Sequence, residues 1–164
     1  MAATPVPCRE VGTNLTVGIG CCSRPRDAWL RCPQVRVAFE PMQSALEAIH
    51  EYYDTFSTLD LNAIVSHFCE PSMTIAPQGV FSAGDRTVLR DSLAPIVDGL
   101  KAKGYGRSEF VQPQVTLLGE TAALVRGVAV RYKAAGPEME RIPISYLMHR
   151  GEAGWKIAVL VVGS

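Results

Sequence analysis

Four polar side chains stand out in the strand-forming half of the sequence: Arg126, Tyr132, Glu140 and Tyr146. Apolar residues alternate around each of them, which predicts that all four share the inner face of one sheet. A guanidinium on an apolar wall needs a carboxylate, water or an anionic ligand as its partner. Arg126 with Tyr146 could therefore orient a carboxylate, enolate or carbonyl oxygen. Alternatively, Arg126 pairs with Glu140 or with a carboxylate of a helix and has only a structural role.

Two further residues could contribute to such a site, besides Trp155 of the closing hairpin. His67 ends a short predicted helix, where its imidazole could act as a base or simply interact with the helix dipole. Tyr53 lies on the packing face of the first predicted helix and could line a cavity or belong to the core. The candidate catalytic residues are thus His67, Glu140 and Tyr146. The candidate ligand-binding residues are Tyr53, Arg126, Tyr132, Tyr146 and Trp155.

Size and charge exclude several classes of protein. The chain has 164 residues, enough for one domain with a core. Its formal net charge is zero, which gives no indication of a nucleic-acid partner or an anionic membrane surface. The longest apolar run, residues 157–162, is too short to span a bilayer. We therefore expect neither a nucleic acid nor a membrane as partner.

The cysteines favour a reduced protein without a metal. Only Cys69 lies in the patterned part of the chain, and the other four precede residue 42. An odd total without a C-x-x-C motif favours neither a disulfide framework nor a zinc site. We expect a cytoplasmic protein with no metal and no cofactor.

Residues 1–41 differ from the remainder. They hold five prolines and five arginines and show no sustained helical or strand period. We predict a disordered N-terminal extension. An organellar transit peptide, or a natural start at Met42, remains an alternative.

Three helices are predicted between residues 42 and 104. The second follows Asp60 and the third follows Asp85, two good N-cap residues, and a kink or break is expected at Pro95. The first helix carries an apolar stripe at three- and four-residue steps, formed by Leu46, Ile49, Tyr53 and Phe56.

Strands account for most of the remaining chain. Two short ones are predicted at 72–76 and 80–82, followed by longer ones at 111–117 and 121–133. A closing hairpin at 139–162 turns at the glycine-rich segment Arg150–Gly154, and its second strand is apolar on both faces. That strand must be covered on both sides.

This order of elements resembles the nuclear transport factor 2-like superfamily, in particular its SnoaL-like members. The segments Ile49–Phe56 and Leu59–Ile64 resemble the opening helices of that family, and Tyr146–Met148 with Gly154–Ile157 resembles its final hairpin. The resemblance implies an α+β domain over residues 42–164, in which a curved antiparallel sheet wraps around three helices as a cone-shaped barrel with an internal pocket.

The same fold hosts isomerases, cyclases, dehydratases, epoxide hydrolases and non-catalytic binders. Its isomerases and cyclases use an aspartate base, and the strand interiors here contain none. The first hypothesis is therefore a binder of a small apolar or weakly anionic metabolite. A cofactor-independent isomerase, cyclase or dehydratase of a carbonyl compound is the alternative, with His67 or Glu140 as base and Tyr146 as donor. A third is an interaction module with a filled cone.

The outer sheet face is also predicted to be apolar. Members of the family often dimerise through this face, and we expect a homodimer. The residues assigned to the patch are Ala129, Leu147, Ala158, Leu160 and Val162.

Overall fold

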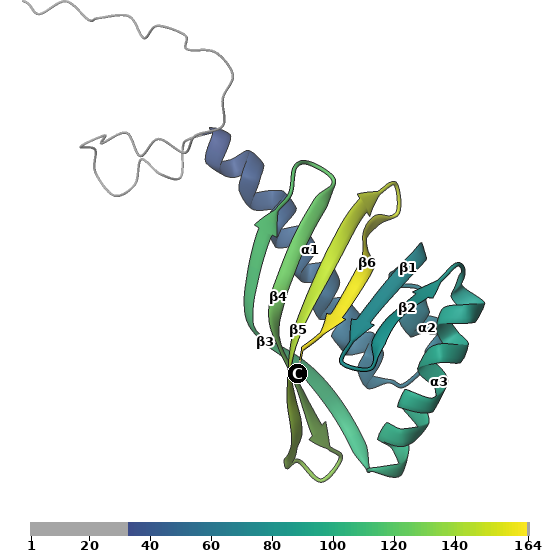
Figure 1. The fold of residues 1–164 in the computed structure, drawn as a ribbon. Coiled ribbons are helices and arrows are strands. Elements are labelled where there is room, and N and C mark those ends of the chain that lie inside the picture. The colour runs from purple at the N-terminus through teal and green to yellow at the C-terminus, as the bar shows by residue number, and fades with distance from the viewer. Residues whose placement is uncertain (1–32, 164) are drawn as a thin grey trace, which may run out of the picture.

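The computed structural model describes residues 33–163, which form three helices and one curved, unclosed six-stranded sheet (Figure 1). This confirms the predicted α+β class. Most of the predicted N-terminal extension, residues 1–32, lies outside the described residues. The helices are α1 (Pro33–Ser57), α2 (Leu61–Val65) and α3 (Arg86–Ala102). The strands are β1 (Phe68–Ala76), β2 (Gly79–Ala83), β3 (Tyr105–Leu117), β4 (Ala122–Lys133), β5 (Glu138–Gly151) and β6 (Gly154–Val162).

The helices begin and end for local reasons. The α1 helix begins at Pro33, earlier than the start at Met42 that the pattern predicted. Its apolar stripe is buried against the sheet. The Asp60 carboxylate accepts hydrogen bonds from two backbone N–H groups of α2, and that of Asp85 accepts one from α3, as expected of N-caps. The predicted break at Pro95 is wrong, because α3 runs through it. Within residues 33–163 no helix is both long and apolar enough to cross a bilayer.

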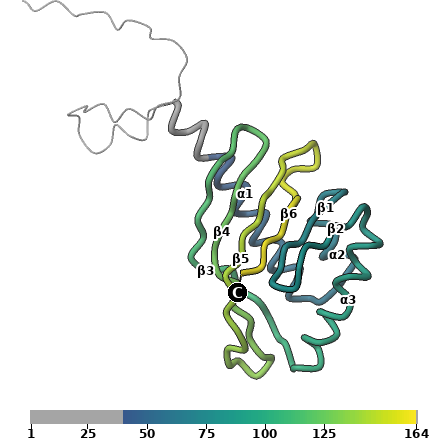
Figure 2. Tube along the Cα trace, viewed as in Figure 1, coloured from purple at the N-terminus to yellow at the C-terminus, as the bar shows by residue number. Residues whose placement is uncertain are grey.

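The strand order is β2-β1-β6-β5-β4-β3, so β6 lies in the middle of the sheet (Figure 2). This position pairs both edges of β6, whereas its outward side chains Val159 and Val161 stay partly exposed, so the strand is not covered on both faces in this chain. All neighbours are antiparallel except β1 and β6, which run parallel, and the prediction of a fully antiparallel sheet is wrong at this pair. The α1 helix lies behind the sheet in the view of Figure 1 and covers the inner face.

The register of β4 against β5 differs from the predicted one by a single residue. Tyr146 pairs with Val125, and Glu140 pairs with Arg131, because the register shifts near the turn and leaves Met139 as an extra residue. A shift by one residue exchanges the two faces of a strand. Consequently Arg126 lies on the outer face, and the inward guanidinium is that of Arg131.

A second irregularity lies in β6. Leu147 pairs with Val159 but Met148 pairs with Ile157, so Ala158 is an extra residue. Beyond it the side chains that face inward are those of Leu160 and Val162. The predicted inward positions of Val159 and Val161 are therefore wrong, and so are the outward positions of Ala129, Leu160 and Val162.

The outer face is nevertheless apolar, with different residues from those predicted. Leu147 is the predicted member of the patch that stays on this face. Strand pairing places it in an outer-face strip, which we define as Met73, Ile75, Leu124, Leu147 and Val159. All five side chains keep some exposure to solvent.

Candidate functional site

A cavity of about 240 Å³ lies on the inner face, between the sheet and the helices α1 and α3. Helix α3 contributes Leu93 and Ile96 to its wall. The polar residues of the lining are Thr74, Gln78, Ser108 and Arg131, besides three tyrosines. The remaining wall is apolar and consists of Phe56, Ala76, Leu93, Ile96, Ala129, Ile142, Ile144, Leu160 and Val162. Such a lining, with few convergent polar groups, is typical of a small-molecule site.

Two buried tyrosines share a hydrogen bond at the wall of this cavity. The hydroxyl oxygens of Tyr53 and Tyr146 are 2.7 Å apart, and either can be the donor. Burial is the main cause that raises the pKa of both phenols above the ordinary value. Both hydroxyls therefore keep their protons well above neutral pH.

Tyr52 supplies a third hydroxyl. Its ring is packed edge-on or tilted against five other rings, with centroid separations of 5.5 to 5.9 Å. No hydrogen bond joins its hydroxyl to another residue in the described part of the chain. Since no fully buried side-chain N or O atom there lacks a partner, the hydroxyl of Tyr52, a residue of the cavity lining, keeps some accessible surface. Tyr52, Tyr53 and Tyr146 are called the cavity tyrosines below.

Arg131 is the charged residue of the lining. Its Nη1 donates to Oε1 of Glu140 over 2.7 Å, and its guanidinium carbon lies 5.7 Å from the centre of the Phe56 ring. The Arg131 side chain is 20% exposed and that of Glu140 is 39% exposed, so the pair lies where the cavity approaches solvent. The partnership predicted for Arg126 and Glu140 is thus made by Arg131.

Two predicted site residues lie outside the cavity lining. His67 Nε2 is 2.9 Å from Thr55 Oγ1, a contact that ties the end of α2 to α1. Burial, and next the nearby charge of Lys156, lower the pKa of His67. Trp155 donates from Nε1 to Ser44 Oγ over 3.0 Å and packs against α1.

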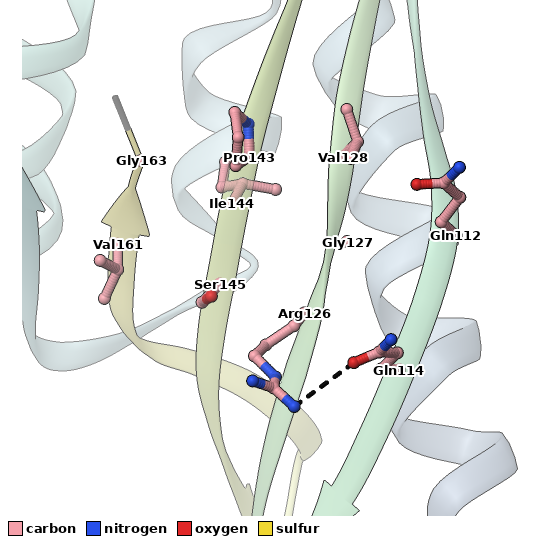
Figure 3. A pocket seen from close by; sticks show the side chains of 10 residues that line it. All are labelled: Gln112, Gln114, Arg126, Gly127, Val128, Pro143, Ile144, Ser145, Val161 and Gly163. Atoms are coloured by element: carbon pink, nitrogen blue, oxygen red, sulfur yellow. Dashed lines mark hydrogen bonds between the residues drawn. The ribbon is translucent and has the colours of Figure 1, made fainter.

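Two others lie on the opposite side of the sheet. Arg126 donates from Nη2 to Gln114 Oε1 over 3.3 Å, in an open groove of about 350 Å³ on the outer face (Figure 3). Tyr132 lies under the guanidinium of Arg107, whose carbon is 4.2 Å from the ring centre. Neither residue can contact a molecule in the inner cavity.

The sequence-based prediction missed Arg131 and Tyr52. Arg131 was assigned to the outer face because of the register error. Tyr52 had a usable signal, since Ala45, Ile49, Tyr52 and Phe56 follow one another at three- and four-residue steps and all are buried.

The chemistry available in the cavity is hydrogen-bond donation. Hydroxyls and a guanidinium can bind an oxygen atom of a ligand. Among the described residues, those that line the cavity include no carboxylate and no imidazole, which are the side chains that most often act as a general base. Nor does the described part of the chain group three His, Cys, Asp or Glu residues as metal ligands.

Comparison with known proteins gives a family and a fold. Residues 43–164 match the family model described as NTF2-like protein (DUF6841). No curated protein matches the chain. Among solved structures, an NTF2-like protein with a cystatin-like fold from Novosphingobium aromaticivorans is 17% identical with a TM-score of 0.63, over 82% of this chain and 90% of that one.

An NTF2-like protein of unknown function from Pseudomonas putida KT2440 is 10% identical with a TM-score of 0.63, over 77% of this chain and 87% of that one. A ketosteroid isomerase-like protein from Erwinia carotovora atroseptica is 16% identical with a TM-score of 0.52, over 76% and 95%. At these identities the structures share the fold alone. With the family match over most of its length, the chain belongs to the NTF2-like family DUF6841.

Proposed function

We propose that this protein binds a small, mostly apolar metabolite in the inner cavity, with the polar end of the ligand held by Arg131 and Tyr52. The observation that carries the proposal is the Tyr52 hydroxyl, which belongs to a cavity-lining residue, keeps some accessible surface and is bonded to no residue in the described part of the chain. A ligand oxygen could accept from this hydroxyl in place of water, and a ligand that filled the cavity without doing so would leave the hydroxyl unpaired at a cost.

The cavity volume limits the size of the ligand. An apolar cavity of about 150 Å³ holds benzene, so in proportion a cavity of 240 Å³ suits a molecule of about ten non-hydrogen atoms. A one-ring compound with a short polar side chain has this size. A steroid is much larger and would require the α3 side of the cavity to move.

Catalysis is the second candidate, and the ketosteroid isomerase-like neighbour favours it only through the shared fold. An isomerase, cyclase or dehydratase would need His67 or Glu140 as its base. His67 is engaged with Thr55 outside the lining, and Glu140 is engaged with Arg131. Binding without chemistry therefore fits these contacts better than proton abstraction does.

Native mass spectrometry of the protein purified from its own cells tests the proposal. We expect a reproducible adduct with the mass of about ten non-hydrogen atoms, as the cavity size implies. Ala129 is almost fully buried and lines the cavity, so Ala129→Leu should fill it and abolish the adduct. Circular dichroism of the variant would check that it is folded. An adduct retained by a folded Ala129→Leu variant would place the ligand elsewhere.

A further inference from the structure

The charge of the cavity depends on a residue outside its wall. Arg131 is the cation of the described lining, and the carboxylate that neutralises it belongs to Glu140, which is not part of the lining. The two side chains come from directly paired positions of β4 and β5 on the inner face. The pair therefore carries no net charge, although the residue that a ligand would contact is positive.

The guanidinium has unused donors. Glu140 accepts from Nη1 only, while a guanidinium carries five N–H groups on three nitrogen atoms. The described residues thus leave N–H groups of Arg131 that a ligand oxygen could accept from. Arg131 and the three cavity tyrosines line the same cavity.

A neutral and an anionic ligand differ in what they demand of this pair. A carbonyl oxygen can accept from an unused N–H of Arg131 and from the Tyr52 hydroxyl without changing the net charge. A carboxylate would share the guanidinium with Glu140, which leaves two negative charges on one positive charge beside a mostly apolar wall. Such an uncompensated charge is strongly disfavoured away from water.

We propose that Glu140 makes the cavity select uncharged, carbonyl-bearing ligands over carboxylates of the same size. The inference rests on the proposed function and narrows its ligand class, because Arg131 alone would favour an anion. Glu140 acts as a specificity-determining residue through Arg131, without contact to the ligand.

Isothermal titration calorimetry of the full chain with two matched probes tests this selectivity. Benzylacetone is a neutral ketone and hydrocinnamate is a carboxylate, and both carry one benzene ring on a short chain of similar size. The unmodified protein should bind benzylacetone more tightly near neutral pH. In Glu140→Gln the affinity for hydrocinnamate relative to benzylacetone should rise about tenfold. The reason is that the charge of Arg131 is no longer neutralised by Glu140, which strengthens the hydrogen bond from Arg131 to the hydrocinnamate carboxylate. The partial exposure of the Arg131 side chain to solvent limits the gain.

Glu138→Gln is the matched control. Glu138 is 38% exposed and accepts from Arg141 Nε over 2.7 Å, so the control removes a similar carboxylate from the same strand. Its partner Arg141 pairs with Val130 of β4, a position whose side chain points away from the cavity. The control should leave the ratio of the two affinities unchanged. Glu140→Gln should fold, since the amide oxygen can still accept from Arg131.

Each outcome is decisive. A ratio that stays the same in Glu140→Gln, or that changes equally in Glu138→Gln, would overturn the selectivity and leave the binding function standing. So would tighter binding of hydrocinnamate to the unmodified protein. If neither probe bound the unmodified protein or either variant, the proposed binding function itself would fail.

Discussion

Removing one hydroxyl of the pair Tyr53–Tyr146 is expected to destabilise the domain through the hydroxyl that remains. Phenylalanine keeps the ring and its packing, so each substitution deletes one oxygen atom. Tyr146 is fully buried, and in Tyr53→Phe its hydroxyl loses the partner at 2.7 Å. A buried hydroxyl left unpaired costs about 1–3 kcal/mol, and we expect about 2 kcal/mol here. Tyr146→Phe should cost slightly less, about 1.5 kcal/mol, because Tyr53 is 5% exposed whereas Tyr146 is fully buried, so water can more readily replace the lost partner of Tyr53.

The double variant distinguishes pairing from general loss of polarity. When both hydroxyls are absent neither is unpaired, so the cost should be at least about 1 kcal/mol less than the sum of the two single costs. Urea unfolding followed by far-ultraviolet circular dichroism measures these differences. With a slope of about 1.5 kcal/mol per molar urea, each single variant should lower the midpoint by about 1 M.

Tyr132→Phe provides the control. Tyr132 lies on the outer face under Arg107, and loss of its hydroxyl should change the free energy of unfolding by less than about 0.5 kcal/mol. If the costs of Tyr53→Phe and Tyr146→Phe simply add in the double variant, to within about 0.4 kcal/mol, the two hydroxyls do not interact in solution. The description of the cavity wall would then be wrong.

Four further perturbations test other parts of the structure. Burial raises the pKa of the cavity tyrosines, so above about pH 10 the unfolded chain releases phenol protons that the folded chain keeps. The free energy of unfolding should therefore fall with rising pH by up to about 1.4 kcal/mol per pH unit for each group. Urea unfolding at successive pH values would measure this fall. Burial lowers the pKa of His67, so the contribution of its neutral imidazole to the free energy of unfolding is present above about pH 6.5 and is lost as the pH falls. His67→Gln should therefore make the urea midpoint less dependent on pH between neutrality and mild acid. An unchanged dependence on pH would contradict this. A Cβ atom on Gly127 would lie 2.5 Å from Cζ of the Phe110 ring, so Gly127→Ala should lower the free energy of unfolding by about 1–3 kcal/mol, measured in urea. As a control, Gly99 in α3 has open space around it, so Gly99→Ala should stabilise the domain by about 0.5–1 kcal/mol. Leu147→Glu in the outer-face strip should convert a homodimer into monomers in analytical ultracentrifugation, and a monomeric unmodified protein would refute the expected interface.

The features that depend on near neighbours in the sequence were predictable. Asp60 and Asp85 begin helices because their carboxylates reach backbone N–H groups two or three residues away. The closing hairpin turns where expected because Gly154 adopts a φ of +84°, which glycine does at little cost. The inner face of β5, from Glu140 to Tyr146, was also correctly assigned by its alternation.

The composition of the site depends on two extra residues, Met139 and Ala158, and was not predictable from periodicity. Met139 adds a residue near the turn between β4 and β5, and every side chain of β4 then changes face relative to the expected pairing. The sequence places a guanidinium at both Arg126 and Arg131, on opposite faces, so alternation alone could not decide between them. The parallel contact between β1 and β6 joins residues far apart in the chain, and nothing local encodes it.

The central place of β6 in the sheet has a consequence for synthesis on the ribosome. Among the described strands β6 is translated last, yet it is the one that joins β1 and β2 to β5, β4 and β3. Before it emerges, a growing chain holds two separate pieces of sheet with open, apolar edges, which are sites for misfolding or chaperone binding. Leu160 and Val162 of β6 also complete the cavity wall. A nascent chain therefore has no complete cavity until translation of this strand is finished, and a molecule bound in that cavity, as proposed above, could assist only the final step of folding.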